Sequence, residues 1–252
     1  MTFSSATAPK LVATFGLDEP SEDEFEQVLY HITHDVRAAL RAIQTLPDWI
    51  REDLEKCQAK VPGSVFEDLE LLKIQTARAD QILIDLRNYS RIGRRSDRPS
   101  NVSLAEAFDI AGQNVENIDR FTVTLDLEAP YLFAPRNDIL TIAHALVSNA
   151  VKHHGASNGK IWIYSAQTPQ CVSLFVEDDG PGIDPQHHER VFQLMTTLRS
   201  RDECEGSGVG LALVSKIMRT LDGQVAIVTP RKLGGTCIAM HFGPACSSKK
   251  AA

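Results

Sequence analysis

Two glycine-rich segments decide the fold of this chain: Asp178-Asp179-Gly180-Pro181-Gly182-Ile183 and Gly206-Ser207-Gly208-Val209-Gly210-Leu211. Glycine permits a positive φ angle and a close approach of the backbone to another group. Two turns of this kind can enclose one nucleotide between them. Each segment taken alone is also compatible with an ordinary turn, so further segments have to decide between the two interpretations.

The first segment follows the apolar run 171–176, which predicts a strand that runs into a turn. Asp178 would line a pocket wall, where its carboxylate can accept a hydrogen bond from an exocyclic amine; this favours adenine over guanine. Gly182 would let the base pack against bare backbone. The second segment runs into a predicted helix, residues 211–221, whose N-terminus can receive phosphate oxygens. No Gly-Lys-Ser/Thr follows, so the pattern is not a P-loop.

A third segment lies upstream, where apolar residues between positions 139 and 151 recur at helical spacing. Asn149 and Lys152 lie three residues apart and share one face of this helix. The amide oxygen can ligate Mg²⁺ while the ammonium group meets phosphate. The alternative is a solvated polar stripe on an amphipathic helix.

Together these segments resemble the ATP-binding domain shared by sensor histidine kinases, type II topoisomerases and the heat-shock chaperones of the same ATPase superfamily. The resemblance covers roughly residues 100–243 and implies ATP and Mg²⁺ as cofactors. It implies that Asn149 is the magnesium ligand, Lys152 a phosphate contact and Asp178 the carboxylate that reads adenine. The residues implied to bind the nucleotide are Asn149, Lys152, His153, Asp178, Gly180, Gly182, Ile183, Gly206, Ser207, Gly208, Val209, Gly210, Leu211 and Thr236.

Two shorter segments carry the same resemblance. Arg190-Val191-Phe192 is similar to the phenylalanine box, which opens the mobile lid over the triphosphate. Gly234-Gly235-Thr236 resembles the signal for the closing strand, where Thr236 would support Asp178 at the adenine. The family usually has a polar residue four positions before the magnesium Asn, and this chain has Ala145 there. That departure leaves open a slow enzyme or a protein that only binds nucleotide.

The N-terminal third predicts a helix, because its apolar residues alternate between spacings of four and three and form a heptad seam. Ser21, with Glu24 three residues later, predicts the helix start through a capping box. With Ile32 at position d and Val36 at position a, His34 falls at f and points away from the seam. The seam positions are Phe25, Leu29, Ile32, Val36, Ala39, Ile43, Leu46 and Ile50.

His34 is the candidate nucleophile of this helix. Asp35 is near enough to orient or deprotonate the imidazole, and Arg37 is available to neutralise incoming phosphate. A surface His beside an Asp usually has no function on its own, but residues 34–40 resemble the phosphoacceptor box of histidine kinases. His31 lies one turn earlier and lacks the following acidic residue.

Ala38 occupies the position where the family often has Thr or Asn, as in phytochrome-type kinases, so we expect weak phosphatase activity. A second helix is predicted after a loop at residues 61–64, and the segment 85–94 also resembles phytochrome-related kinases. Two such helices form a hairpin whose apolar stripe is too large to leave in water, so we expect a homodimeric four-helix bundle. The apolar positions of the second helix are Leu69, Leu72, Thr76, Ala79, Leu83 and Leu86.

The expected domains are a flexible tail (residues 1–20), a dimerisation and phosphoacceptor hairpin (21–95), an ATP-binding domain (100–243) and a C-terminal tail (244–252). In the third of these, the patterns predict helices at 104–117 and 211–221 and strands at 121–127, 160–166, 171–177, 224–229 and 237–241, besides the helix that contains Asn149. The fold class is α+β: the helical hairpin, followed by an α/β sandwich of the histidine kinase type.

Composition favours a cytoplasmic protein. No stretch approaches the ~20 apolar residues that a membrane helix needs, and the N-terminus lacks the order of a signal peptide. The odd count of 5 cysteines without metal spacing suits a reducing compartment. The chain has 33 acidic against 26 basic residues, so the arginines near position 94 are interpreted as a solvated hinge rather than as a nucleic-acid site.

The leading hypothesis is a histidine kinase that phosphorylates His34 from MgATP and passes the phosphate to an aspartate on a response regulator receiver domain. A separate sensor protein is one expected source of the input signal. The first alternative is a phosphotransfer or scaffold protein of the same fold with little turnover. The second is another ATPase or a protein-serine kinase of the superfamily, which would lack the hairpin with its exposed His and Asp.

Overall fold

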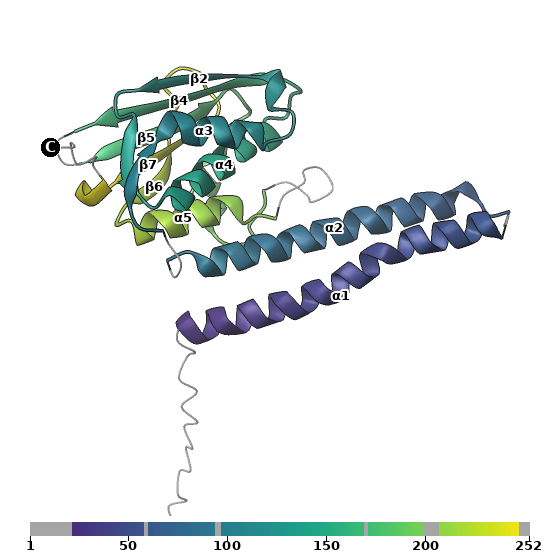
Figure 1. The fold of residues 1–252 in the computed structure, drawn as a ribbon. Coiled ribbons are helices and arrows are strands. Elements are labelled where there is room, and N and C mark those ends of the chain that lie inside the picture. The colour runs from purple at the N-terminus through teal and green to yellow at the C-terminus, as the bar shows by residue number, and fades with distance from the viewer. Residues whose placement is uncertain (1–21, 58–59, 94–96, 169–170, 199–206, 247–252) are drawn as a thin grey trace, which may run out of the picture.

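The computed structural model describes residues 22–57, 60–93, 97–168, 171–198 and 207–246, with side chains from Ile32 onward. A helical hairpin and an α/β domain follow one another along the chain (Figure 1). The hairpin consists of α1 (Glu22–Lys56) and α2 (Gly63–Arg91), and these two long helices run side by side. Both predicted parts of the fold class are therefore confirmed. The capping box at Ser21 lies outside the described residues.

Two different faces of α1 are apolar or tightly packed. Thr33 and Pro47 are buried against α2, and Leu40 between them is half-buried. The predicted heptad seam lies on another face: Ile32 is 53% exposed and Leu46 is 43% exposed. All six seam positions from residue 32 onward are exposed in the single chain. The hairpin thus closes without using the seam, and the seam stays available to a further partner.

Two prolines shape the hairpin. Pro47 lies inside α1, where its missing N–H removes one backbone hydrogen bond, and the axis of α1 changes direction along its length (Figure 1). Pro62 is the N-cap of α2, which begins at Gly63. Placing residues 63 and 64 in a loop was therefore wrong, because the proline ends the connection and the helix begins directly after it.

The α/β domain is built on a five-stranded sheet with the order β2-β4-β5-β7-β6. Strand β2 is parallel to β4, and the other pairs are antiparallel. A separate two-stranded sheet pairs β1 with β3. The strands are β1 (Ser100–Ser103), β2 (Phe121–Leu127), β3 (Tyr131–Ala134), β4 (Gly159–Gln167), β5 (Val172–Asp178), β6 (Gln224–Val228) and β7 (Cys237–Phe242).

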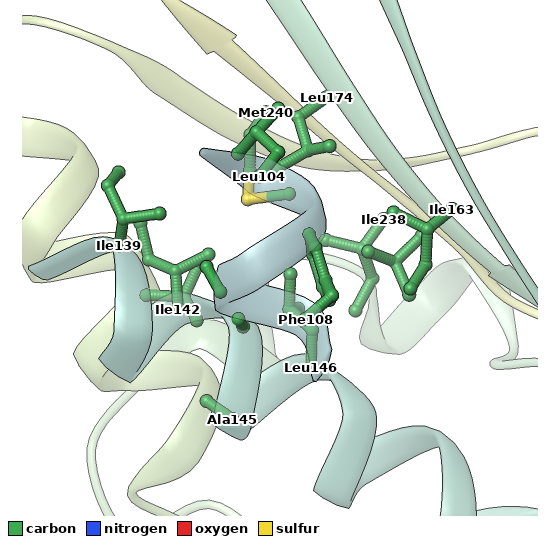
Figure 2. Packing of buried hydrophobic residues seen from close by; sticks show 14 of the residues in the cluster. Leu104, Phe108, Ile139, Ile142, Ala145, Leu146, Ile163, Leu174, Ile238 and Met240 are labelled. Carbon is green, nitrogen blue, oxygen red and sulfur yellow. The ribbon is translucent and has the colours of Figure 1, made fainter. Parts of the chain in front are cut away.

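Three helices cover one face of this sheet (Figure 1): α3 (Leu104–Gln113), α4 (Arg136–His153) and α5 (Gly210–Thr220). Figure 2 shows the core between the layers, where side chains of α3 and α4 meet those of β4, β5 and β7. The core keeps water away from one side of the sheet and holds α4 in place. Its residues include Leu104, Phe108, Ile139, Ile142, Leu146, Ile163, Leu174, Ile238 and Met240.

The other face of the sheet carries an aromatic stack. The rings of Trp162 and Tyr164 lie 4.1 Å apart, and those of Tyr164 and Phe175 lie 4.6 Å apart. The guanidinium of Arg231 lies 5.4 Å from the centre of the Tyr164 ring. Glu177 is fully buried beneath the segment before β7 and accepts hydrogen bonds from the backbone N–H groups of residues 231, 232 and 233. The carboxylate thereby fixes the backbone segment that leads to Thr236.

The predicted elements of the α/β domain agree with the structure to within one residue, with three exceptions. The first helix ends at Gln113 rather than 117, because Asn114 leaves the helical conformation with φ −107° and ψ 5°. The β1–β3 sheet was not predicted. The domain also extends past residue 243: the turn η4 (Pro244–Cys246) carries Cys246, which is buried in the core, so residues 244–246 are not a flexible tail. None of the helices among the described residues has both the length and the apolar character needed to cross a bilayer.

Candidate nucleotide-binding site and phosphoacceptor

Asp178 ends β5 and is buried at the point where two backbone segments meet. Its Oδ1 accepts hydrogen bonds from the N–H groups of Gly180, at 2.9 Å, and Thr236, at 3.0 Å. Its own N–H donates to the carbonyl of Thr236, at 2.9 Å. Among the described residues, both of these hydrogen bonds to the carboxylate involve Oδ1, which leaves Oδ2 as the oxygen that can accept from an exocyclic amine. The side chain is thus held in one orientation before any ligand arrives.

The glycines beside Asp178 are required by close packing. A Cβ at Gly235 would lie 2.5 Å from the carbonyl oxygen and from Oδ1 of Asp178, and 2.5 Å from the nitrogen of Gly180. Gly182 has a φ of 76°, which favours glycine. Thr236 is buried and Ile183 is half-buried, and both residues line a hollow of about 510 Å³. Sequence reasoning placed these residues together, and the structure does bring them together.

Burial raises the pKa of the Asp178 carboxyl above its usual value, although the N–H groups of Thr236 and Gly180 act in the opposite direction. The neighbouring Asp179 shows the reverse result. Burial tends to raise its pKa, but the hydrogen bonds from the Lys160 backbone and from His154 outweigh burial and lower the pKa below the usual value. The two adjacent carboxyls therefore differ in how readily they ionise.

Helix α4 presents the polar residues predicted to meet the phosphates and the metal. Asn149 and His153 are half-buried, and Lys152 is exposed in the last turn. Ala145 is buried and lies 3.9 Å from the position that a Cβ of Gly210 would take. A small residue at 145 therefore lets α4 approach the N-terminus of α5. The described residues contain no group of three or more His, Cys, Asp and Glu side chains that could hold a metal ion.

The donors present fit magnesium held partly by phosphate. Mg²⁺ prefers oxygen ligands and is usually bound through one or two protein groups together with substrate phosphates. Asn149 supplies an amide oxygen on the helix that also carries Lys152. A magnesium ion bound by Asn149 would thus take part of its coordination from the nucleotide.

The second glycine segment leads into α5. Gly208 has a φ of 68°, and a Cβ there would lie 2.7 Å from the carbonyl oxygen of Thr196. Ser207 donates to Oδ2 of Asp85 on α2, at 2.5 Å. Val209 and Leu211 are buried and anchor the turn, whereas Gly206 lies outside the described residues. The turn that precedes α5 therefore contacts the hairpin.

The phenylalanine box forms the turn η3 (Arg190–Phe192), in which Val191 is buried in the core. Just before it, the ring nitrogen Nε2 of His188 lies 2.9 Å from the carbonyl oxygen of Ile183 and ties this turn to the first glycine segment. The predicted lid continues into residues 199–206, including Cys204, and these lie outside the described residues.

His34 lies on α1 with its side chain 67% exposed. Its Nδ1 lies 3.1 Å from Oδ1 of Asp35, as expected for a carboxylate that orients the ring. Arg37 differs from the expectation that it would meet incoming phosphate. Its Nε donates to Oδ1 of Asp80 on α2 at 2.6 Å, and a second guanidinium nitrogen donates to Oδ2 at 3.3 Å. Arg37 therefore joins the two helices, because its charge is already paired in a two-point contact.

Sequence reasoning missed the pair formed by His154 and Asp179. His154 follows α4 and is buried, and its Nε2 lies 2.8 Å from Oδ1 of Asp179, which follows β5. No local pattern marks such a pair, because its members lie 25 residues apart and each resembles an ordinary polar residue at the end of an element.

Comparison with known families agrees with this geometry. Residues 135–245 match the family described as histidine kinase-, DNA gyrase B-, and HSP90-like ATPase. The methanogenesis regulatory histidine kinase FilI of Methanothrix harundinacea is 28% identical over 233 residues, which cover 91% of this chain and 26% of that protein. The phytochrome-like protein Cph1 of Synechocystis is 25% identical over 82% of this chain and 28% of its own length. The chain thus spans about a quarter of these relatives.

Solved structures share the fold over most of the chain. Full-length ShkA in complex with AMPPNP aligns with a TM-score of 0.62 at 17% identity, over 90% of this chain and 47% of that one. The histidine kinase AdeS of Acinetobacter baumannii aligns with a TM-score of 0.56 at 21% identity, over 82% and 97%. ThkA in complex with the response regulator protein TrrA aligns with a TM-score of 0.57 at 21% identity, over 89% and 64%.

Proposed function

This chain is a transmitter module of the sensor histidine kinase family, and on that premise we propose that it phosphorylates His34 from MgATP and passes the phosphate to an aspartate of a response regulator receiver domain. One observation carries the proposal. A carboxylate held in one orientation at Asp178 and an exposed His34 paired with Asp35 occur on the same chain, each on its own folded part.

The pairing at His34 indicates which nitrogen attacks. If Nδ1–H donates to Asp35, the lone pair lies on Nε2, which is then the nucleophile. Nε2 forms a bond to the γ-phosphorus, and the bond between that phosphorus and the β,γ-bridging oxygen breaks, so ADP leaves. The ring keeps the proton on Nδ1 and gains a positive charge, which the Asp35 carboxylate stabilises. Magnesium would supply charge neutralisation on the phosphates.

Each residue of the α/β domain has a proposed role in binding the nucleotide. Asp178 accepts from the adenine amine through Oδ2, with Thr236 and the first glycine turn holding it in place. Asn149 ligates the metal, and Lys152 and the turn before α5 contact the phosphates. The hairpin (residues 21–95) is proposed as the phosphoacceptor domain and the following part as the catalytic domain, which extends to residue 246 because Cys246 is in the core.

The exposed seam of α1 supports a homodimer. A row of apolar side chains at heptad spacing, left uncovered by α2, matches what a second copy of the hairpin would bury in a four-helix bundle. The receiver domain would dock on the neighbouring exposed surface of α1. Four residues of that surface beside His34 are Ala38, Arg41, Ala42 and Thr45, all exposed.

A phosphotransfer or scaffold protein without turnover is the second candidate, and Ala145 is the observation that favours it. Ala145 stands where the family usually has a polar residue, and its methyl group packs towards Gly210. A methyl group offers no oxygen to a metal. Binding of ATP without transfer to His34 would support this candidate.

The proposal is tested by incubating the purified chain with γ-labelled ATP and Mg²⁺ and treating the product with acid or base. Acid-labile, base-stable label on the parent, absent from His34→Gln and from Asp178→Ala, is the expected result. Absence of label on a parent that binds ATP would overturn kinase activity and favour the scaffold. Acid-stable label would indicate phosphoserine or a related product instead.

A further inference from the structure

His154 is a buried polar residue at the meeting point of three elements. It follows the last turn of α4, and its ring lies edge-on to Phe121 at the start of β2, with ring centres 5.1 Å apart. Its Nε2 contacts Oδ1 of Asp179 at 2.8 Å, and the same oxygen accepts from the backbone N–H of Lys160 on β4 at 2.6 Å. One carboxylate oxygen thus ties the end of α4 to the turn after β5 and to the start of β4.

The neighbouring glycines show how closely this pair is fitted. A Cβ at Gly159 would lie 2.3 Å from Nε2 of His154 and 2.9 Å from Oδ1 of Asp179. A Cβ at Gly180 would lie 3.4 Å from the Cα of His154 and 3.0 Å from Oδ1 of Asp178. The space for the imidazole is therefore left by two glycines, one of which belongs to the turn that holds Asp178.

Stability alone does not account for an imidazole at this position. Nδ1 of His154 is buried and has no hydrogen-bond partner among the described residues. A buried polar atom without a partner costs free energy that an apolar side chain of similar size would avoid. Since Asp179 remains an ionised acceptor, the ring donates through Nε2 and leaves a bare Nδ1 lone pair. What the imidazole provides in return for this cost is the hydrogen bond from Nε2 to Asp179.

We propose that the hydrogen bond between His154 and Asp179 sets the position of the adenine-binding turn relative to α4, which makes His154 a positioning residue for nucleotide binding. The inference rests on the proposed function, since it concerns the same site. Asn149 and Lys152 lie five and two residues before His154 on α4, whereas Asp178 directly precedes Asp179. The bond therefore fixes the distance between the groups that hold phosphate and metal and the group that reads the base.

A ligand that spans both sets of groups depends on this distance. ATP contacts the adenine carboxylate and the phosphate residues at the same time, so a small shift of one set weakens binding to the whole ligand. Adenosine contacts only the first set and should be less sensitive. A ratio of affinities for ATP and adenosine therefore reports positioning, whereas loss of general fold stability lowers neither affinity while the protein stays folded.

The test uses the full chain, three single variants and the double variant that combines His154→Leu with Asp179→Ala. His154→Leu removes the donor and keeps an apolar side chain, whereas His154→Gln places an amide N–H at the same number of bonds from Cα as Nε2. Asp179→Ala removes the acceptor and leaves the histidine in place. Affinities for ATP and adenosine are measured by calorimetry well below the unfolding temperature of each variant.

We expect His154→Leu and Asp179→Ala each to weaken ATP about 10-fold and adenosine less than about 3-fold, as loss of one charge-assisted hydrogen bond implies. The double variant should be no weaker than Asp179→Ala, because Asp179→Ala already removes the bond that His154→Leu removes. His154→Gln should stay within about 3-fold of the parent. Should His154→Leu fail to fold, Asp179→Ala carries the test.

Two results would overturn the inference. One is unchanged ATP affinity in the folded variants, and the other is an equal loss for ATP and adenosine that His154→Gln does not rescue. These differ from a failure of the proposed function, in which the parent itself binds ATP without forming phosphohistidine. That outcome leaves the affinity comparison valid. A parent that binds no ATP would refute both.

Discussion

The hydroxyl of Ser207 donates a hydrogen bond of 2.5 Å to Oδ2 of Asp85, so the turn before α5 is attached to helix α2 of the hairpin. A second contact lies close by, where Nζ of Lys216 donates to the carbonyl of Tyr89 at 3.0 Å and lies 4.5 Å from the centre of its ring. Ser207 is also one of the residues proposed to contact phosphate. The Asp85 carboxylate therefore already accepts a hydrogen bond from the hydroxyl group that is proposed to contact phosphate.

Replacing Asp85 should tighten nucleotide binding. Asp85→Asn removes a negative charge beside the turn that receives phosphate oxygens, so phosphate meets less repulsion there. We expect ATP affinity to rise about 2- to 5-fold, the size typical of a partly exposed charge interaction. Titration of the chain with a fluorescent ATP analogue measures the change. Asp68→Asn, an exposed position on the same helix, is the control; equal effects of the two variants would contradict the prediction.

Asp178→Asn should separate binding from stability. In the folded parent, the pKa of the Asp178 carboxyl is raised, chiefly by burial. The carboxyl therefore stabilises the fold below its unfolded-state pKa, and this contribution to stability is lost as pH rises through the folded-state pKa. Above the unfolded pKa, this group therefore contributes less to the stability of the ligand-free chain than it does at low pH. Thermal unfolding at pH 7 without nucleotide should show Asp178→Asn at least as stable as the parent.

The same variant should bind ATP at least about 10-fold more weakly, since a hydrogen bond to a charged group is lost. The amide oxygen has to accept from Gly180 and Thr236, so its NH₂ group replaces Oδ2 and faces the adenine amine, donor against donor. Calorimetric titration with ATP measures this. Retained ATP affinity together with lower stability would be the opposite of what we expect.

Gly235→Ala should disrupt the base-binding turn. The added methyl group would lie 2.5 Å from backbone and side-chain atoms of Asp178 and from the nitrogen of Gly180, and backbone atoms cannot move aside cheaply. We expect a loss of about 1–3 kcal/mol in the free energy of unfolding, as overpacking implies, and loss of ATP binding. Chemical denaturation measures the first. Gly63→Ala, which meets nothing within 4 Å, is the matched control and should leave both properties unchanged.

Ile43→Asp should convert the dimer to monomer. Ile43 lies on the seam that α2 does not cover and is 38% exposed in the single chain, so a charge there would be buried only between two copies. Light scattering coupled to gel filtration gives the mass in solution. Thr45→Asp, exposed on α1 but away from the seam, should remain dimeric. A monomeric parent would refute the four-helix bundle.

Local patterns predicted most of the α/β domain. Residues 121–127 alternate in a way that identifies β2, and the glycine turns mark the ends of β5 and the start of α5, all near their observed positions. The short strands β1 and β3 were missed, because four residues carry too little periodicity to be recognised.

Contacts between distant residues could not be predicted. The bond from Arg37 to Asp80 depends on how α1 and α2 are aligned, and that between Ser207 and Asp85 depends on how the two parts of the chain pack. The spacing of residues along one helix reveals neither how the two helices align nor how the two parts of the chain pack. Thr236 lies 58 residues from Asp178 and was predicted to support it only through the family resemblance, whereas His154 needed the fold.

The most direct test of the account is to locate the phosphate on the phosphorylated chain. After reaction with MgATP, phosphorus NMR and mass spectrometry at alkaline pH identify the modified residue and the ring atom. The account predicts phosphate on Nε2 of His34, because Nδ1 is held by Asp35. Phosphate on another residue, or none on a chain that binds ATP, would contradict it.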